Sequence, residues 1–197
     1  MRGALRIVMA SRNQHKVREL ASVLAPHTLE PLPEWVELPP EDGDTFTDNA
    51  LIKARAAAAA TGVPVLADDS GIVVPALAGA PGVRSARYAG PSATDQENLD
   101  KLVEDMSGED DRRAAYVCVL ALVEPDGSER VFEGRCEGRL VSSPRGSGGF
   151  GYDPAFVPDD LDGANRTMAE ITPAEKHAIS HRGRAARSLA TALGEAP

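Results

Sequence analysis

The stretch that decides the fold is LADDSGIVVPALAGAPGVRSARYAG, residues 66–90. Val63, Val65 and Leu66 predict a buried strand that ends in two adjacent carboxylates, Asp68 and Asp69, and the Ser-Gly pair that follows permits a tight turn or a close backbone approach. Because the carboxyl ends of strands in open α/β sheets face the ligand crevice, such carboxylates can hold Mg²⁺ against a phosphate or orient a water molecule. An isolated Asp-Asp pair is more often a solvated turn, so the neighbouring segments must decide.

Two short segments rich in glycine and other turn-forming or small residues follow this strand directly. GAPG, residues 79–82, and SARYAG, residues 85–90, interrupt any regular helix or strand pattern. They place Arg84, Arg87 and Tyr88 on irregular backbone near the carboxylates, which is typical of loops that carry function. These neighbours favour a functional reading of the aspartate pair.

Length and composition limit the class of protein. The chain has 197 residues, of which 42% are hydrophobic and 26% charged, so we expect one globular domain over residues 1–197. The formal net charge of −9 argues against a general nucleic-acid or membrane binder, which needs a basic surface. No apolar run approaches the roughly 20 residues that span a bilayer, and the N-terminus lacks an apolar signal region, which predicts a cytoplasmic protein.

The N-terminal residues predict a strand that runs directly into a helix. Residues 5–10 are apolar, and from Asn13 onward apolar side chains recur at helical spacing. The connecting turn, SRNQHK at residues 11–16, then lies at a helix N-terminus, where free N–H groups favour an anion. Ser11 and Lys16 add donors, so the turn could cradle a triphosphate. It is not a Walker A loop, and a purely structural polar turn is the common alternative.

Several other elements are expected to be scaffold. A strand or an extended segment is predicted around residues 29–38, with Trp35 packed, and a capped helix at residues 92–106. The apolar segments on either side of EPDGS predict a β-hairpin with an Asp-Gly turn. Cys118 and Cys136 lie on these hairpin strands without a CxxC pair, which predicts reduced core thiols.

The helix after the acidic segment carries an unusual lysine. Asp44 or Thr45 can cap this helix, which is expected to run to about Thr61. Lys53 falls on its otherwise apolar face. Such a lysine either snorkels to solvent or turns, together with Asn49, toward a phosphate site.

Two further segments carry candidate ligand contacts. RGSGGFGYDPAF, residues 145–156, has too many glycines for a helix or strand, and its Phe150 could stack on a purine, although a flexible turn is an equal alternative. The C-terminal segment begins with a capping box at Thr172 and then presents Lys176, His181 and Arg182 ahead of an apolar helix face.

These motifs together resemble the inosine triphosphate pyrophosphatase family over residues 10–185. The motifs that carry the resemblance are ADDSG, GAPGV and SARYAG in the central block, S-x-N-x-x-K at residues 11–16, E-x-x-x-x-F-x-D-N-A-x-x-K-A at residues 41–54, GGFGYDP at residues 148–154, and K-x-x-x-S-H-R-G at residues 176–183. Ser11 and Asp48 stand where the family more often has threonine and glutamate. Members hydrolyse the non-standard purine nucleotides ITP, dITP and XTP to the monophosphate and pyrophosphate.

The resemblance implies an α/β fold with a twisted mixed β-sheet flanked by helices, in an elongated two-lobed domain with a central cleft. It also suggests a homodimer. It implies Mg²⁺ held by Glu41 and Asp69, with Asp69 as the catalytic residue and Asp68 in either the first or the second coordination sphere. His181 and Arg182 would read the purine 6-oxo group. Substrate binding is implied for Ser11, Arg12, Asn13, Gln14, His15, Lys16, Lys53, Ser70, Phe150, Gly151, Tyr152, Asp153, Lys176, His181 and Arg182.

Two alternatives to this enzyme stay open. One is a catalytically silent purine nucleotide sensor, against which the retained Glu41, Asp68 and Asp69 weigh because binding alone needs no metal-and-water site. The other is a pyrimidine nucleoside triphosphate pyrophosphatase of related architecture. Turnover of ITP compared with dTTP and UTP separates the three.

Overall fold

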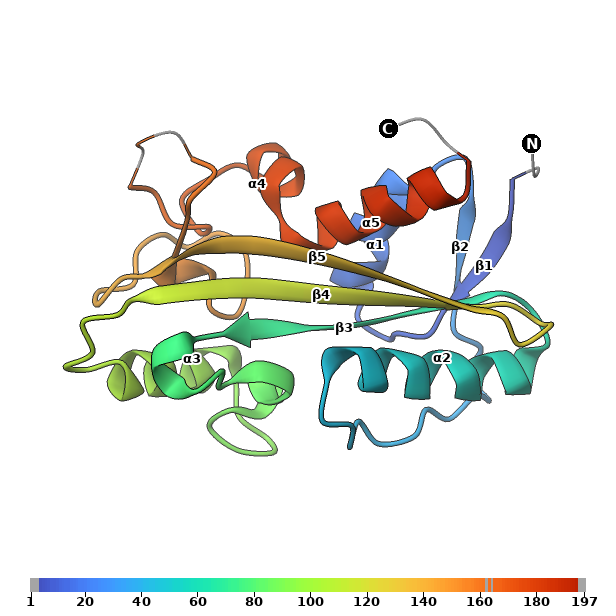
Figure 1. Cartoon of the computed structure of the whole chain (residues 1–197), viewed down its shortest axis with the longest axis horizontal. Helices are drawn as coiled ribbons and strands as arrows, with labels where there is room; N and C mark the ends of the chain where they lie inside the picture. Colours follow the sequence, from blue (N-terminus) through green and yellow to red (C-terminus); the bar gives the residue numbers. More distant parts are fainter. Residues whose placement is uncertain (1–3, 162, 164, 195–197) are drawn as a thin grey trace. The chain divides into compact units, whose positions relative to one another are not determined.

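The computed structural model describes residues 4–161, 163 and 165–194, without the side chains of Gln14 and His15 (Figure 1). The elements follow in this order: β1 (Arg6–Met9), α1 (Gln14–Val23), β2 (Thr28–Pro31), α2 (Phe46–Thr61), β3 (Val65–Val73), η1 (Pro75–Leu77), η2 (Gly82–Arg87), α3 (Asp95–Asp105), β4 (Arg113–Val123), β5 (Glu129–Leu140), η3 (Asp153–Ala155), β6 (Phe156–Pro158), α4 (Pro173–Ile179) and α5 (His181–Ala192). In this described part of the chain, no helix combines the length and the apolar composition that crossing a bilayer requires.

The strands form a mixed six-stranded sheet with the order β2-β1-β3-β4-β5-β6. β1 pairs parallel with both β2 and β3, whereas β6 pairs antiparallel with β5. The adjacent strands β4 and β5 are joined by the predicted Asp-Gly turn, in which Glu124 N donates to Ser128 O at 2.9 Å. The predicted α/β class with a mixed sheet is confirmed.

Three helices begin after capping threonines: Thr45, one of two expected caps, Thr172, as expected, and Thr94, two residues after the predicted start of its helix at residue 92. Thr45 Oγ1 accepts a hydrogen bond from Asp48 N at the start of α2. Thr94 and Thr172 form capping boxes at the starts of α3 and α4, each with a glutamate three residues further on. Because such caps satisfy N–H groups that a helix leaves unpaired, they fix these boundaries locally.

The chain forms two compact units, of which the first comprises Met1–Asp69, Cys118–Gly134 and His181–Pro197. Alternate residues of its strands belong to two core clusters, because successive side chains point to opposite faces of a strand. One cluster joins Ile7 of β1 to α1 and α5, and the other joins Val8 to α2. Helices therefore cover both faces of this part of the sheet (Figure 1).

The second unit comprises Ser70–Val117 and Arg135–Ser180. Its core is one cluster in which Leu102 of α3 packs with strand residues, and the rings of Tyr116 and Phe156 meet edge to face with centroids 4.8 Å apart. The expectation of one two-lobed domain with a central cleft concerns the arrangement of the two units, and it stays a prediction.

Strand β3 does not end at the aspartates, contrary to the sequence prediction. It runs over Val65–Val73, so that Asp68 and Asp69 lie within it. Of the two roles open to Gly71, the close backbone approach is the one found, because a Cβ at Gly71 would lie only 2.3 Å from Ser85 Oγ. The glycine marks a contact between segments and not a turn.

Only the beginning of the segment around residues 29–38, predicted as a strand or an extended segment, forms a strand, and the prediction that Trp35 packs was wrong. β2 covers only Thr28–Pro31, and its whole register pairs with the four residues Arg6–Met9 of β1. Pro31 pairs with Met9, the last residue of β1. Since β1 offers no residue beyond Met9, β2 ends at Pro31. Trp35 follows in the next segment and is 67% exposed.

Both cysteines lie in the core, as predicted. Cys118 and Cys136 are free and buried, and they belong to different core clusters. Burial raises the pKa of the Cys118 thiol to about 12, which makes it a poor nucleophile. The redox state of the two thiols in solution stays a prediction.

Candidate active site

The turn between β1 and α1 begins beside the part of β3 that contains Asp68 and Asp69. Met9 pairs with Leu66, and Ala10 N donates to the carbonyl oxygen of Leu66 at 2.8 Å. Asn13 Oδ1 then accepts from Lys16 N at 3.3 Å, which organises the first turn of α1. The predicted strand-turn-helix unit is present. The predicted contacts of the Gln14 and His15 side chains lie outside the described residues.

A pocket of about 510 Å³ opens at this turn, within the size range of small-molecule sites. Its lining mixes cationic, acidic and apolar residues: Ala10, Ser11, Arg12, Lys16, Glu37, Leu38, Glu41 and Lys53. Arg12 Nη2 donates to the carbonyl oxygen of Val36 at 3.1 Å, which ties the segment before α2 to the turn. The pocket thus brings together residues predicted to bind phosphate and metal from three separate segments.

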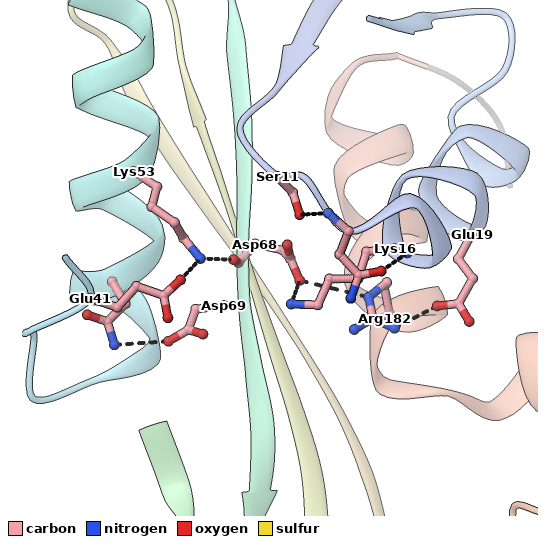
Figure 2. A network of polar contacts seen from close by, with 10 residues as sticks. Ser11, Lys16, Glu19, Glu41, Lys53, Asp68, Asp69 and Arg182 are labelled. Atoms are coloured by element: carbon pink, nitrogen blue, oxygen red, sulfur yellow. Dashed lines mark hydrogen bonds and ion pairs between the residues drawn. The ribbon is translucent and has the colours of Figure 1, made fainter. Parts of the chain in front are cut away.

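Asp68 is buried and lies against two cations (Figure 2). Lys16 Nζ is 2.8 Å from Asp68 Oδ2, and Arg182 Nε is 3.9 Å from the same oxygen. Burial alone would raise the pKa of this carboxyl, but the charges of Lys16, Arg182 and Lys53 outweigh burial and lower the pKa to about 2. Asp68 is therefore a fixed anion at neutral pH, and it orients Lys16.

Arg182, the second residue of α5, is held by a further carboxylate and by close helix packing. Its Nη1 donates to Glu19 Oε2 of α1 at 2.6 Å (Figure 2). Helix α5 lies directly on Gly134 of β5, where a Cβ would be 2.1 Å from His181 O and 2.4 Å from Ala185 N. Only glycine permits this approach, so Gly134 helps to fix the position of the Arg182 guanidinium.

Asp69 is placed with α2 and the segment before it. Asn49 Nδ2 donates to Asp69 Oδ2 at 3.1 Å, and Lys53 Nζ donates to the carbonyl oxygen of Asp68 at 2.7 Å and also to Glu41 Oε1. Lys53 is therefore buried and turned inward, so it does not snorkel to solvent, whereas its predicted role at a phosphate site stays a prediction. Burial raises the pKa of Asp69, Lys53 opposes this, and the charge of Glu41 raises it further.

The two neighbouring aspartates thus have pKa values moved in opposite directions. Asp68 stays ionised beside Lys16, whereas Asp69 is moved toward the range in which a carboxylate can accept a proton. Such a separation is typical of sites that divide electrostatic and acid-base roles between two carboxyl groups.

Glu41 and Asp69 also fit a magnesium ion. Their mutual repulsion contributes to the raised pKa of Asp69, so a cation bound by both would relieve it. No cluster of three or more His, Cys, Asp or Glu in the described part of the chain forms a complete metal cage. Mg²⁺ commonly binds through one or two carboxylates and completes its shell with water and substrate phosphates. The two carboxylates of Glu41 and Asp69 fit this way of binding Mg²⁺.

A second group of predicted site residues surrounds Asp153 in the other unit. Asp153 Oδ2 accepts from Phe150 N at 2.9 Å and from Lys176 Nζ at 2.5 Å, and Oδ1 accepts from the Tyr116 hydroxyl at 3.1 Å. Lys176 Nζ lies 4.7 Å from the centroid of the Phe150 ring, and Phe150 is 41% exposed. An exposed ring held in this way can stack on a base. Tyr152 is buried, so it supports the loop from within.

The sequence profile of the Ham1 family matches residues 7–192. The chain belongs to the Ham1 family. A dITP/XTP pyrophosphatase of Streptomyces coelicolor is 47% identical over 96% of this chain and 98% of that protein. One of Frankia alni is 50% identical over 97% of this chain and 98% of that protein. The structure of a HAM1 protein from Coxiella burnetii is 45% identical, with a TM-score of 0.89 over 98% of this chain and 100% of that one.

In this Ham1 protein the predicted site residues fall into two groups, one in each unit. The first unit holds Ser11, Arg12, Asn13, Lys16, Glu41, Lys53, Asp69, His181 and Arg182, and the second holds Ser70, Phe150, Gly151, Tyr152, Asp153 and Lys176. Lys176 and Arg182 belong to different units, and their expected joint contact with the substrate stays a prediction. Lys176 contacts Asp153, whereas Arg182 contacts Glu19 and lies near Asp68.

Sequence reasoning missed Glu19 in this Ham1 chain. Glu19 follows Lys16 by three residues on α1, a spacing that reads as an ordinary surface ion pair. Its partner is instead Arg182, which is 163 positions away along the chain. No local pattern predicts such a pair, and only the packing of α1 beside α5 produces it.

Proposed function

We propose that this Ham1 protein hydrolyses the non-standard purine nucleoside triphosphates ITP, dITP and XTP to the monophosphate and pyrophosphate. The observation that carries the proposal is the adjacent pair Asp68 and Asp69, of which one is held ionised by Lys16 and the other has a raised pKa. The relatives named dITP/XTP pyrophosphatase, matched over nearly their whole length, support this substrate class.

In the proposed reaction, Asp69 orients a water molecule and takes its proton as the water oxygen attacks the α-phosphorus. The fixed position of Asp69 supports this role, because Asn49 Nδ2 holds one of its carboxylate oxygens at 3.1 Å and a general base must be held in place. Lys16 and Lys53 line the pocket and offset the negative charge of the phosphates, and Ser11 adds a hydroxyl at the start of α1. Pyrophosphate leaves with the electron pair of the broken P–O bond.

Glu41 and Asp69 are the residues that would hold Mg²⁺. When bound, the ion supplies positive charge that polarises the phosphoryl group. Asp68 is engaged by Lys16 and buried, which supports a role in positioning that lysine and not in direct metal binding.

Each residue proposed to bind the base has its own supporting contacts. Phe150 would stack on the purine, and Lys176, held by Asp153, would donate to the base or a phosphate. His181 is kept as the proposed donor to the 6-oxo group. For Arg182, the contacts with Glu19 and Asp68 support a different role, which is to hold Asp68.

The test is pyrophosphate release from ITP, dITP and XTP by the full-length protein with Mg²⁺, compared with ATP, dTTP and UTP and followed by phosphorus NMR. We expect turnover of the three non-standard purines and little of the others. The Asp69→Asn variant, purified in parallel, controls for contaminating hydrolases. Binding of ITP without turnover would indicate a sensor, and preference for dTTP or UTP would indicate a pyrimidine enzyme. Either result contradicts the proposal.

We also propose that the protein is a cytoplasmic homodimer without nucleic-acid or membrane partners. The net charge of −9 supports the last point, because it disfavours polyanionic surfaces. Sedimentation velocity at micromolar concentration tests the dimer, and a single monomeric species would contradict it.

A further inference from the structure

A second pocket, in the unit of Ser70–Val117 and Arg135–Ser180, carries an unusual concentration of positive charge. Its volume is about 480 Å³. It is formed at the start of β4 and by the end of β5 with the loop after it, and its lining residues are Arg112, Arg139, Leu140, Val141, Ser142, Ser143 and Arg145. Three arginines around one hollow are unexpected in a protein whose formal net charge is −9. None of these residues belongs to the candidate active site.

Within the described ranges, the partners that anchor Arg112 are neutral. Its Nε donates to the carbonyl oxygen of Leu140 at 3.2 Å and its Nη1 to that of Met106 at 2.8 Å. Its Nη2 is buried and has no hydrogen-bond partner among the described residues. Carbonyl groups orient a guanidinium but do not neutralise it, and a buried donor left unpaired is costly. Arg112 therefore adds a pre-oriented positive charge, not neutralised by its carbonyl partners, to the lining of the pocket.

The other two arginines are also only partly compensated. Arg139 Nη2 donates to the side-chain oxygen of Asn165 at 2.9 Å, and Arg145 Nη2 donates to the main-chain oxygen of Asn165 at 2.5 Å. Among the described residues, the only ion pair of these three arginines is between Arg145 Nε and Glu170 Oε2, at 3.5 Å. Three guanidinium groups thus face one carboxylate.

We propose that this pocket binds a phosphate-type oxyanion: free phosphate, pyrophosphate, or the phosphate group of a nucleotide. Guanidinium groups match the geometry of phosphate oxygens and bind them through paired, charge-assisted hydrogen bonds. Ser142 and Ser143 add hydroxyl groups at the rim. An anion in the pocket would compensate the excess charge of Arg112 and Arg139. The chain then has a second anion site besides the one proposed for catalysis, and this inference does not depend on the proposed reaction.

The test is calorimetric titration of the full-length protein, without divalent cations, with inorganic phosphate, pyrophosphate and a nucleoside monophosphate in separate experiments. The main variant is Arg139→Gln, because Arg139 is exposed and its loss should not disturb the core. Arg113→Gln is the matched control: it removes the same charge from an exposed arginine that lies outside the pocket and pairs with Asp111 at 2.6 Å. Circular dichroism confirms that both variants are folded.

We expect Arg139→Gln to weaken binding of at least one of the three anions by roughly tenfold or more, as the loss of a charge-assisted contact implies. Arg113→Gln should bind like the wild type. Which of the three anions shows the difference identifies the form of phosphate that the pocket takes. Arg145→Gln should weaken the same binding.

The inference is overturned if Arg139→Gln and Arg145→Gln both bind all three anions as the wild type does. It is equally overturned if Arg113→Gln loses as much affinity, because the effect would then be general charge and not the pocket. Since no turnover is measured, a failure here is distinguishable from a failure of the proposed hydrolysis.

Discussion

Replacing Asp68 by asparagine should lower the stability of the protein at neutral pH and remove part of its sensitivity to acid. Asp68 is 1% exposed, and its pKa is about 2 in the folded protein against 3.8 for the unperturbed side chain. Nearly two pKa units correspond to ~2.5 kcal/mol of folding free energy, because each unit is worth about 1.4 kcal/mol. The folded state favours the ionised form, so this contribution is complete above the unfolded pKa of 3.8 and disappears as the pH falls through about 2.

The assay is urea unfolding of wild type and variant from neutral pH down to about pH 2, followed by far-ultraviolet circular dichroism. Fluorescence is the weaker probe, because Trp35 is 67% exposed in the folded protein. We expect the difference in the free energy of unfolding between the two proteins to be ~2.5 kcal/mol near neutral pH and to shrink toward zero at the acid end.

Asp111→Asn is the matched control for this prediction. The pKa of Asp111 is also lowered to about 2, by hydrogen bonds from Arg113, but Asp111 lies at the surface. Solvent and salt screen such a pair, so we expect a much smaller loss of stability than at Asp68. Equal losses in the two variants, or a difference at Asp68 that does not vary with pH, would refute the reasoning.

Three further predictions follow from the site and the core. Asp69→Asn should lower kcat by roughly 100-fold, and wild-type turnover would remove Asp69 from the mechanism. The variant should be at least as stable as the wild type at neutral pH, because the raised pKa of Asp69 means that the fold disfavours its ionised form. In steady-state assays, Phe150→Ala should lower kcat/KM for ITP and ATP by similar factors. Arg182→Ala should also leave the ratio of the two kcat/KM values unchanged, since Arg182 contacts Glu19. A selective loss of kcat/KM for ITP in Arg182→Ala would instead indicate that Arg182 contacts the base. Cys118 and Cys136 should titrate as two free thiols in the denatured protein without reductant, and a count of zero would contradict this.

Features with local causes could be predicted from the sequence. The cap at Thr172 depends on a glutamate three residues away, and this predicted capping box is present. The strand-turn-helix unit around Ser11 and Lys16 likewise follows from an apolar run beside a helical pattern.

Features with distant causes could not be predicted. Gly71 continues a strand because Ser85 approaches it, and no neighbour in the sequence distinguishes this from a turn. The length of β2 depends on the length of β1, which is its pairing partner. Arg182 takes its orientation from Glu19, a residue near the other end of the chain that no local motif connects with it.

The contact at Gly134 has a consequence for how this site can be adjusted. Alanine there would place a Cβ 2.1 Å from the His181 carbonyl oxygen, where ordinary van der Waals contact needs at least 3.4 Å. Helix α5 and strand β5 would have to separate by about 1 Å, although no charge and no hydrogen-bonding group had been changed. The spacing between the Arg182 guanidinium and the Asp68 carboxylate is thus a property of backbone packing. Their electrostatic coupling therefore depends on a position that has no side chain of its own.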